Sequence, residues 1–350
     1  MAIRDVVAKY APLVVLHADD KLRPSSADWF LDRSTLRWAT GRGLDGDAVH
    51  EPDDDIHPGR LGAAGPNPYR HGEFIASALT RPLDDNAGRR GEPPLEQGFF
   101  LRLKEESFAR GDEGSTVYWD YDEHAKAITY WLFYPGSSPP LGILRAGEQI
   151  GTRGVPTEAV PTELEAADAA AKLEEFQRAY PGLAQEAEPD VRTRGLGDVI
   201  QRLKVVAEGV RALLREDGVL HEGDWERITV YLNEADPEGA PPASVGFYRH
   251  STNTFKKWDN VEKEAGMHPI VYSAIGSHAS LPSPDFGFID VGDPDGPHWR
   301  SWEDLAPIEE QPWYGFGGAW GRVGKVRDST GPLGPGAHWK HAAPRPARPE

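Results

Sequence analysis

Glycine and proline interrupt this chain so often that long regular elements are excluded over most of it. The 350 residues include 38 glycines and 31 prolines, about a fifth of the sequence, against about 12% in average proteins. Because proline lacks a backbone donor and glycine weakens helices and strands, such a chain folds mainly into short elements joined by loops. Its length is ample for a buried core without disulfide support.

Charge and cysteine content narrow the classes of function. The formal net charge is −18, and there is no cysteine. An acidic surface repels nucleic-acid phosphates and anionic lipid headgroups, so we expect no nucleic-acid partner and no electrostatic membrane docking. The absence of cysteine excludes disulfides, zinc–thiolate sites, thiol nucleophiles and iron–sulfur clusters.

The N-terminal residues do not have the pattern of a signal peptide. Their short apolar run is broken by Pro12 and His17, and no small-residue cleavage site follows it. No apolar stretch in the sequence approaches the roughly 20 residues that span a bilayer. We therefore expect no transmembrane segment and a cytoplasmic location, with leaderless export as an open alternative. The sequence leaves the oligomeric state open.

Several segments have the composition of β-strands, being rich in β-branched and aromatic residues and bounded by glycine, proline or asparagine. They are residues 116–122, 127–135, 226–232, 243–250 and 268–276. Short strands separated by many turns favour a mainly β fold. We predict a two-sheet β-sandwich with long loops, forming a single domain over residues 1–340, with a loose tail at 341–350.

One region has a helical pattern instead. Thr162 and Glu165 form a capping box in front of residues 164–180, and Asp198 precedes a second stretch at 199–217. Apolar residues recur in the second stretch at spacings of three and four. The sequence therefore predicts an α-helical hairpin at 155–218, inserted into the β domain.

The segment HEGDWERITVYL, residues 221–232, contains the sharpest chemical pattern. Asp224 and Glu226 are two residues apart at the beginning of the expected strand, so both carboxylates point to one face. The same parity continues into Ile228, Val230 and Leu232, which places the two acids on the core-facing side at the open end of a sheet. Two inward carboxylates repel each other unless a proton or a cation lies between them.

His221 lies three residues before Asp224, and we expect it in the preceding turn, over the same point. One imidazole and the carboxylates of Asp224 and Glu226 make a three-ligand site for a divalent cation such as calcium, magnesium, manganese or zinc. A structural alternative also fits the spacing. Asp224 could cap a turn, while Glu226 pairs with Arg227 or Arg249.

Two further histidines follow apolar strands. His250 ends the expected strand 243–250, and His278 lies in the turn after the strand at 268–276. Loops at strand ends are a common place for functional side chains. If these strand ends converge, both histidines join Glu226 as candidate catalytic residues, and either could shuttle a proton. Each histidine taken alone also fits a hydrogen-bonded residue of a turn.

Several of these blocks together resemble the vacuolar protein sorting-associated protein 62-related family. The matching blocks are HEGDWERITVYL, YRH at 248–250 and HPIVYSAIGSHAS at 268–280, together with residues 10–31, YWLFYP at 130–135, PWYGFGGAWG at 312–321 and GPLGPGAHW at 331–339. The resemblance covers most of the chain outside the predicted hairpin. It implies a fold and a site more than a defined activity.

A more distant resemblance connects His221, Asp224 and Glu226 to the necrosis- and ethylene-inducing-like proteins. Their GHRHDWE heptapeptide lies on a β-sandwich and binds a divalent cation near a membrane glycolipid. The same H-x-x-D-x-E spacing occurs in this sequence, so the resemblance implies a cation at these three residues. Their additional upstream Asp ligand has no counterpart, because Leu213 stands at that distance.

These observations lead to one expected function and its alternatives. We expect a metal-dependent enzyme, most simply a hydrolase acting on a small-molecule, lipid or glycan substrate. One alternative is a cation-dependent glycolipid- or sugar-binding protein without turnover. Others are a lyase or cyclase acting on a small metabolite, and a structural role for the acids.

Overall fold

The computed structural model is mainly β, as the sequence predicts. It describes residues 3–39, 48–49, 98–103, 115–138, 174, 177–178, 220–233, 235–237, 239–249, 252–286, 290–314, 316, 319–322 and 330–335.

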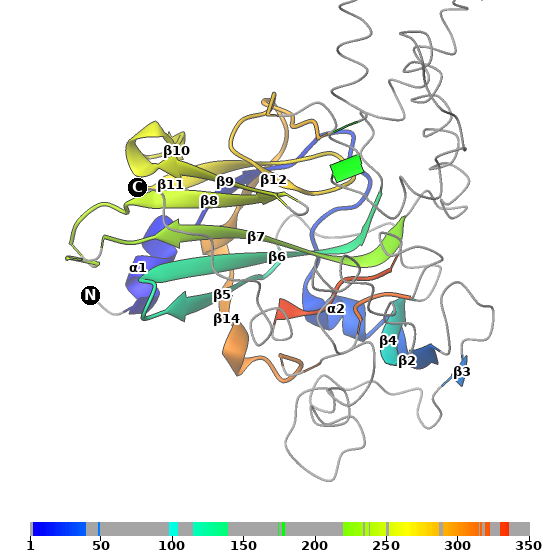
Figure 1. Ribbon diagram of the computed structural model, residues 1–350. Helices are drawn as coiled ribbons and strands as arrows, with labels where there is room; N and C mark the ends of the chain where they lie inside the picture. The colour runs from blue at the N-terminus through cyan, green and yellow to red at the C-terminus, as the bar shows by residue number, and fades with distance from the viewer. Residues whose placement is uncertain are drawn as a thin grey trace, which may run out of the picture.

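A six-stranded sheet forms the largest layer (Figure 1). Its strands, in spatial order, are β14 (Leu305–Pro307), β5 (Val117–Asp122), β6 (Ala127–Ser137), β7 (His221–Tyr231), β8 (Ser244–Arg249) and β9 (Thr252–Lys257). The β14–β5 pair is parallel, and the other neighbours are antiparallel. The two longest strands, β6 and β7, lie at its centre.

A second sheet connects distant parts of the chain. Its path is β10 (Lys263–Glu264), β11 (His268–Ser273), β1 (Leu13–Val15) and β13 (His298–Arg300), and β12 (Ser280–Leu281) pairs with β11. The pairing of β1 with β11 is parallel and places Leu13 opposite Ile270. A smaller third sheet has the order β3 (Ala48–Val49), β2 (Ser34–Ala39) and β4 (Gly98–Leu103).

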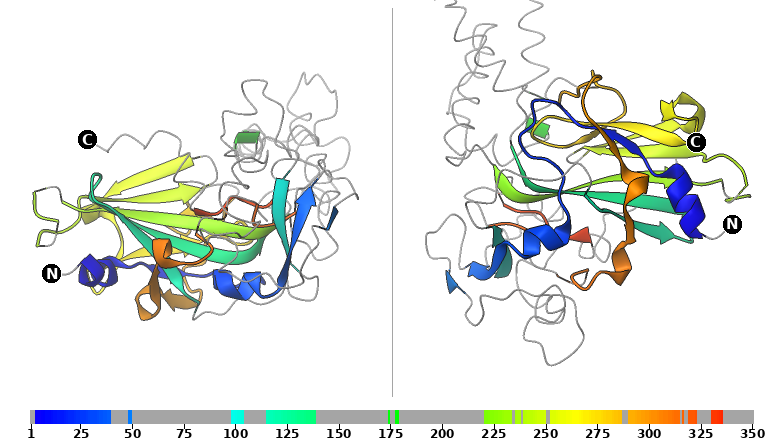
Figure 2. Two further views of the ribbon diagram at one scale, coloured as in Figure 1. Left: turned by 90° about the horizontal axis from the view of Figure 1, so that it is seen from below. Right: turned by 180° about the vertical axis from the view of Figure 1, so that it is seen from behind.

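The helices whose two ends lie within the described ranges are short. They are α1 (Ile3–Tyr10), α2 (Ala27–Leu31) and the 3-10 turns η3 (Trp258–Asn260), η4 (Ser301–Glu303) and η5 (Ile308–Glu310). Glu174, Gln177 and Arg178 are also helical. The side chain of Ser26 caps α2 by accepting the Trp29 amide at 3.1 Å. Figure 2 shows α1 near one end of the long central strands and α2, with the third sheet, near the other.

Burial on both faces of β6 explains its continuous aromatic sequence. Tyr130 and Tyr134 point to a core cluster that also contains Val14 and Val271 of the second sheet. Trp131 and its alternating neighbours point to a second cluster on the opposite face, formed with Trp225, Trp313 and Trp320. The five-stranded and six-stranded sheets therefore share one core, and tryptophans fill the other.

The structure confirms a strand in each of the five segments for which the sequence predicts one, with altered ends. The largest difference is in β7, which begins at His221, a residue that the sequence pattern predicts to lie in a turn. The strand starts early because β6 continues to Ser137, which pairs with His221. No helix within the described ranges is both long and apolar enough to cross a membrane.

Two predicted features lie outside the described residues. One is the tail at 341–350. The other is the hairpin at 155–218, of which the structure describes Glu174, Gln177 and Arg178 alone. The extent of the single domain, 1–340, stays a prediction.

Candidate functional site

His278 is the centre of the candidate site, in the tight connection between β11 and β12. Its amide donates to the carbonyl of Ala274 at 2.9 Å, and its backbone has the left-handed φ of +52°. That conformation costs a non-glycine residue about 1–2 kcal/mol, so the surroundings must stabilise it. The imidazole is almost completely enclosed, with 1% of the side-chain surface exposed.

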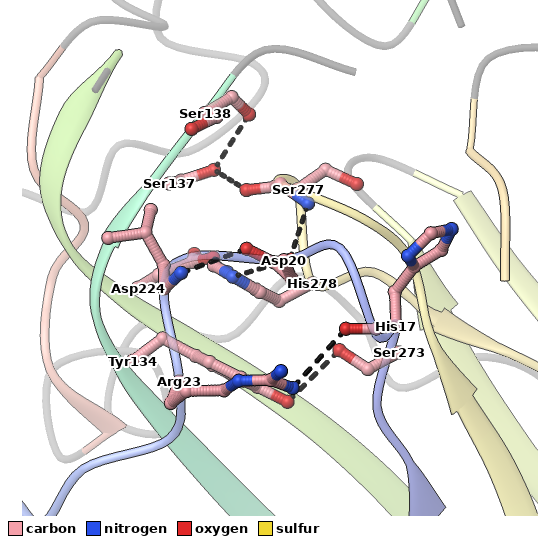
Figure 3. A network of polar contacts seen from close by, with 12 residues as sticks. His17, Asp20, Arg23, Tyr134, Ser137, Ser138, Asp224, Ser273, Ser277 and His278 are labelled. Carbon is pink, nitrogen blue, oxygen red and sulfur yellow. Dashed lines mark hydrogen bonds and ion pairs between the residues drawn. The ribbon is translucent and has the colours of Figure 1, made fainter. Parts of the chain in front are cut away.

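Two carboxylates enclose the His278 ring, one at each nitrogen (Figure 3). Nδ1 lies 2.8 Å from Oδ2 of Asp224, and Nε2 lies 3.4 Å from Oδ2 of Asp20. Asp224 accepts a hydrogen bond from Nδ1, whereas Nε2 is buried without a hydrogen-bond partner among the described residues and lies at ion-pair distance from Asp20. Two carboxylates this close favour the charged form of the ring. Asp20 Oδ2 also accepts the amide of Gly276 at 2.7 Å, which fixes the turn that carries the ring.

Tyr134 contacts the face of the His278 ring, in addition to the carboxylates at its edge. The Tyr134 ring stacks on His278 with a centroid separation of 3.9 Å and an angle of 4°. The Tyr134 hydroxyl is 3.1 Å from the hydroxyl of Ser273, so the aromatic ring is held from β11 as well as from β6. Stacking on an electron-rich ring also stabilises a protonated imidazole.

The charges around His278 shift its titration. Burial by itself lowers the pKa, because it disfavours the charged form, but Asp20 and Asp224 outweigh burial and raise the pKa of His278 to about 9. Burial by itself raises the pKa of Asp20, because the charged form of an acid is also disfavoured. The His278 imidazolium and the amides of Gly276 and Leu22 outweigh burial and hold this pKa below its ordinary value. The two shifts agree in describing a buried ion pair at neutral pH.

Glu226 lies beside this group in a different environment. Asp224 pairs with Tyr134 across the strands and Glu226 pairs with Leu132, so both carboxyls lie on the same face of β7, as the sequence predicts. The pKa of Glu226 is raised well above its ordinary value. Burial of the carboxyl is the largest cause, and the nearby negative charges of Asp224 and Asp290 add to it. The residue nevertheless keeps part of its surface exposed.

Gly223 changes the direction of β7 just before the two acids. Its φ is +62°, and a Cβ at this position would lie 1.9 Å from the carbonyl oxygen of Trp320. The change sends the buried Glu222 side chain toward β4, where Oε2 accepts the amide of Leu103 at 3.0 Å. Glu222 therefore does not join Asp224 and Glu226, although strict alternation would place the three on one face.

His221 is placed differently from the expectation. The carbonyl oxygen of Gly223 accepts a hydrogen bond from Nδ1–H of His221 at 2.8 Å. In a neutral ring this leaves the lone pair on Nε2, which is the arrangement that metal-binding imidazoles use. However, across the described ranges no three His, Asp or Glu side chains gather closely enough to hold a metal ion. The set of His221, Asp224 and Glu226 is not assembled as a cation site, and the cation stays a prediction.

The structural alternative from the sequence does not describe Asp224, whose carboxylate binds His278 instead of capping a turn. Arg227 lies over the rings of Trp131 and Tyr248, 5.4 Å and 4.2 Å from their centroids. Arg249 lies 3.7 Å from Asp290. His250 is outside the described residues, so its proposed catalytic role stays a prediction.

Sequence reasoning missed Asp20 and Tyr134 as members of the site. Asp20 belongs to the block at 10–31 that carries the family resemblance, but nothing local connects it to His278, 258 positions away. Tyr134 belongs to an aromatic strand whose neighbours are core residues. Only the sheet pairing brings the three together.

No family model, curated protein or solved structure matches the chain. The resemblance to the two families stays a prediction, and the site is interpreted from its own geometry.

Proposed function

We propose that this chain is a hydrolase in which Asp224 and Glu226 act as a carboxyl acid–base pair on an uncharged small-molecule, lipid or glycan substrate. One observation carries the proposal: two carboxyls share one face of β7 in different environments, with Asp224 bound to His278 and Glu226 beside it. Pairs of acids whose surroundings separate their protonation states are typical of acid–base catalysis.

The roles follow from those environments. His278 orients the Asp224 carboxylate through the 2.8 Å contact, and in the proposed role Asp224 accepts a proton from an attacking water. The raised pKa of Glu226 suits this residue to donate a proton to the leaving oxygen. The water oxygen bonds to the substrate as the bond to the leaving oxygen breaks. Transfer of a proton from Asp224 to Glu226 through solvent then restores the starting state.

The charge of the group supports an uncharged substrate. Asp20, Asp224 and Asp290 carry three negative charges, and His278, Arg249 and Arg227, whose charge acts on Glu226, carry three positive ones. The group is therefore close to neutral with Glu226 protonated and offers no excess positive charge to an anion. The net charge of −18 over the whole chain also disfavours an anionic substrate.

The proposal extends to the finer structural predictions. We infer that the five-stranded and six-stranded sheets form a sandwich, which the shared core of Tyr130, Val14 and Val271 supports. The helical hairpin at 155–218 belongs to the same proposal; this segment precedes β7 in the sequence, and all of it but 174 and 177–178 lies outside the described residues. A cytoplasmic location belongs to the same proposal.

Hydrolysis of a panel of p-nitrophenyl glycosides and esters tests the proposal, with p-nitrophenyl phosphate as the anionic comparison. We expect turnover of an uncharged member, reduced about 100-fold or more in Asp224→Asn and Glu226→Gln. Glu264→Gln, at an exposed carboxyl of β10, is the matched control and should keep full activity. No turnover of any member, or turnover unchanged in both site variants, overturns the acid–base role.

The same protein preparation can distinguish acid–base catalysis without a metal from a metal-dependent hydrolase. Protein purified without metal-affinity resin is analysed for metal by plasma mass spectrometry and assayed after dialysis against chelator. We expect activity to survive chelation. Activity that is lost on chelation and restored by a divalent cation, with stoichiometric metal that disappears in Asp224→Ala, would replace the acid–base proposal with a metal-dependent hydrolase.

A further inference from the structure

A second buried carboxylate holds the turn of His278 from a different segment. The hydroxyl of Ser277 donates to Oδ1 of Asp290 at 2.7 Å. The Asp290 side chain has no exposed surface, and its Oδ2 lies 3.7 Å from Nη1 of Arg249. A fully buried carboxylate destabilises the folded state unless such partners stabilise it. The fold therefore depends on the contacts of Asp290 with Ser277 and Arg249.

The backbone next to Asp290 reinforces the same connection. The amide of Ile275 donates to the carbonyl of Val291 at 2.9 Å. Arg249, at the end of β8, also donates to the carbonyl of Phe286 at 3.4 Å and lies over its ring, 5.5 Å from the centroid. The end of β8, the segment around Asp290 and the turn of His278 are thereby joined through one carboxylate.

The turn needs this support because a non-glycine residue in it has a left-handed backbone. His278 has φ of +52°, whereas the φ of +77° at Gly276 is one that glycine adopts readily. Asp20 accepts the amide of Gly276, and Ser138, directly after β6, donates its amide to the carbonyl of Gly276 at 2.7 Å. Ser277, the residue directly before the strained histidine, is held by Asp290.

We propose that Asp290 is a positioning residue for the site: acting through Ser277, and stabilised by Arg249, it sets the approach of the His278 imidazole to Asp224. The role of Asp290 in catalysis rests on the proposed hydrolase function. Its effect on the contact between His278 and Asp224 does not, because that contact can be measured whether or not the protein turns over a substrate.

Nuclear magnetic resonance of protein labelled with ¹⁵N at histidine tests the positioning role. We expect a low-field Nδ1–H resonance from the hydrogen bond between His278 and Asp224, assigned by its loss in His278→Gln. In Asp290→Asn and in Ser277→Ala, this resonance should disappear or exchange with water about tenfold faster. Ser277→Thr keeps the hydroxyl and should restore the signal in part.

Controls separate positioning from general stability. Asp285→Asn changes an exposed carboxylate close to Asp290 in the sequence and should leave the resonance unchanged. Thermal unfolding identifies a variant that fails to fold, and if Asp290→Asn does so, Ser277→Ala decides. An unchanged resonance and exchange rate in a folded Ser277→Ala variant overturns the proposal.

The two proposals fail in distinguishable ways. If no hydrolysis is found, the resonance still tests the role of Asp290. If hydrolysis is found, a positioning role predicts that Ser277→Ala lowers kcat more than it raises KM. A proportionate loss of folded protein, with both constants unchanged per folded molecule, contradicts that role.

Discussion

At the scale of single residues, His278 has the most direct thermodynamic consequence. Its pKa is raised from 6.5 to about 9 in the folded protein. A group whose folded pKa is raised stabilises the fold fully below the unfolded pKa, and the stabilisation is lost as the pH rises through the folded pKa. Protonation of one buried ring is therefore linked to the stability of the whole chain.

We expect the free energy of unfolding to fall between about pH 6.5 and pH 9, by on the order of 3 kcal/mol. His278→Gln should remove that fall. Urea unfolding at a series of pH values measures it, with His298→Gln, at an exposed histidine, as the control that keeps the wild-type slope. Identical slopes in the wild type and in His278→Gln would show that the ring is not charged in the folded state.

Tyr134 allows the stacked ring and its hydroxyl to be tested separately. Tyr134→Phe keeps the ring on His278 and removes the hydroxyl that lies beside Ser273, so we expect a loss of about 1 kcal/mol in unfolding free energy. Tyr134→Leu also removes the ring and should cost about 3 kcal/mol or more. Equal losses in the two variants, measured by urea unfolding, would show that the stack contributes nothing.

At the scale of the elements, β7 depends on one glycine. Gly223→Ala combines a left-handed backbone with a clash against the carbonyl of Trp320, so we expect it to cost about 3 kcal/mol or more. Gly266→Ala is the matched control: its φ is +74°, but nothing lies within 4 Å of the added carbon. That variant should lose about 1 kcal/mol. Similar losses in the two thermal melts would argue against the clash.

The same strand shows what local sequence can and cannot predict. The alternation from Asp224 to Val230 correctly places both acids on one face, because the period of a strand is a local property. The start of the strand at His221 and the turn of the buried Glu222 side chain toward β4 are not local properties. The first depends on the pairing of His221 with Ser137 of β6, and the second on Gly223, which meets Trp320, 97 residues later.

In the candidate site, too, local features could be predicted from the sequence and contacts between distant segments could not. The sequence predicts His278 in a turn after its strand and brings it to Asp224 only if the strand ends converge; the structure shows this one contact. His250, the other histidine of that prediction, lies outside the described residues. The partnership with Asp20 could not be predicted, because it depends on the parallel pairing of β1 with β11. Three-residue strands such as β1 carry too little pattern to specify a distant partner.

At the scale of the whole molecule, the pairing of β1 with β11 connects the N-terminal segment to the C-terminal half of the chain. Residues 13–15 are flanked by strands from residues 270–272 and 298–300, while Val6, Val7 and Tyr10 of α1 enter the same core. Contacts of such long sequence separation form late and at high entropic cost, so the protein is expected to fold slowly. The N-terminal segment then both completes the core and brings Asp20 to His278.

Removal of residues 1–15 should therefore abolish cooperative thermal unfolding, because β11 and β13 lose the strand between them and the shared core loses α1. Removal of residues 341–350, the predicted tail, is the control and should leave the midpoint within a few degrees of the full chain. Calorimetry measures both. A cooperative transition retained without residues 1–15 would mean that the six-stranded sheet is stable alone, and that the second sheet serves to place Asp20 and His278 instead of holding the fold together.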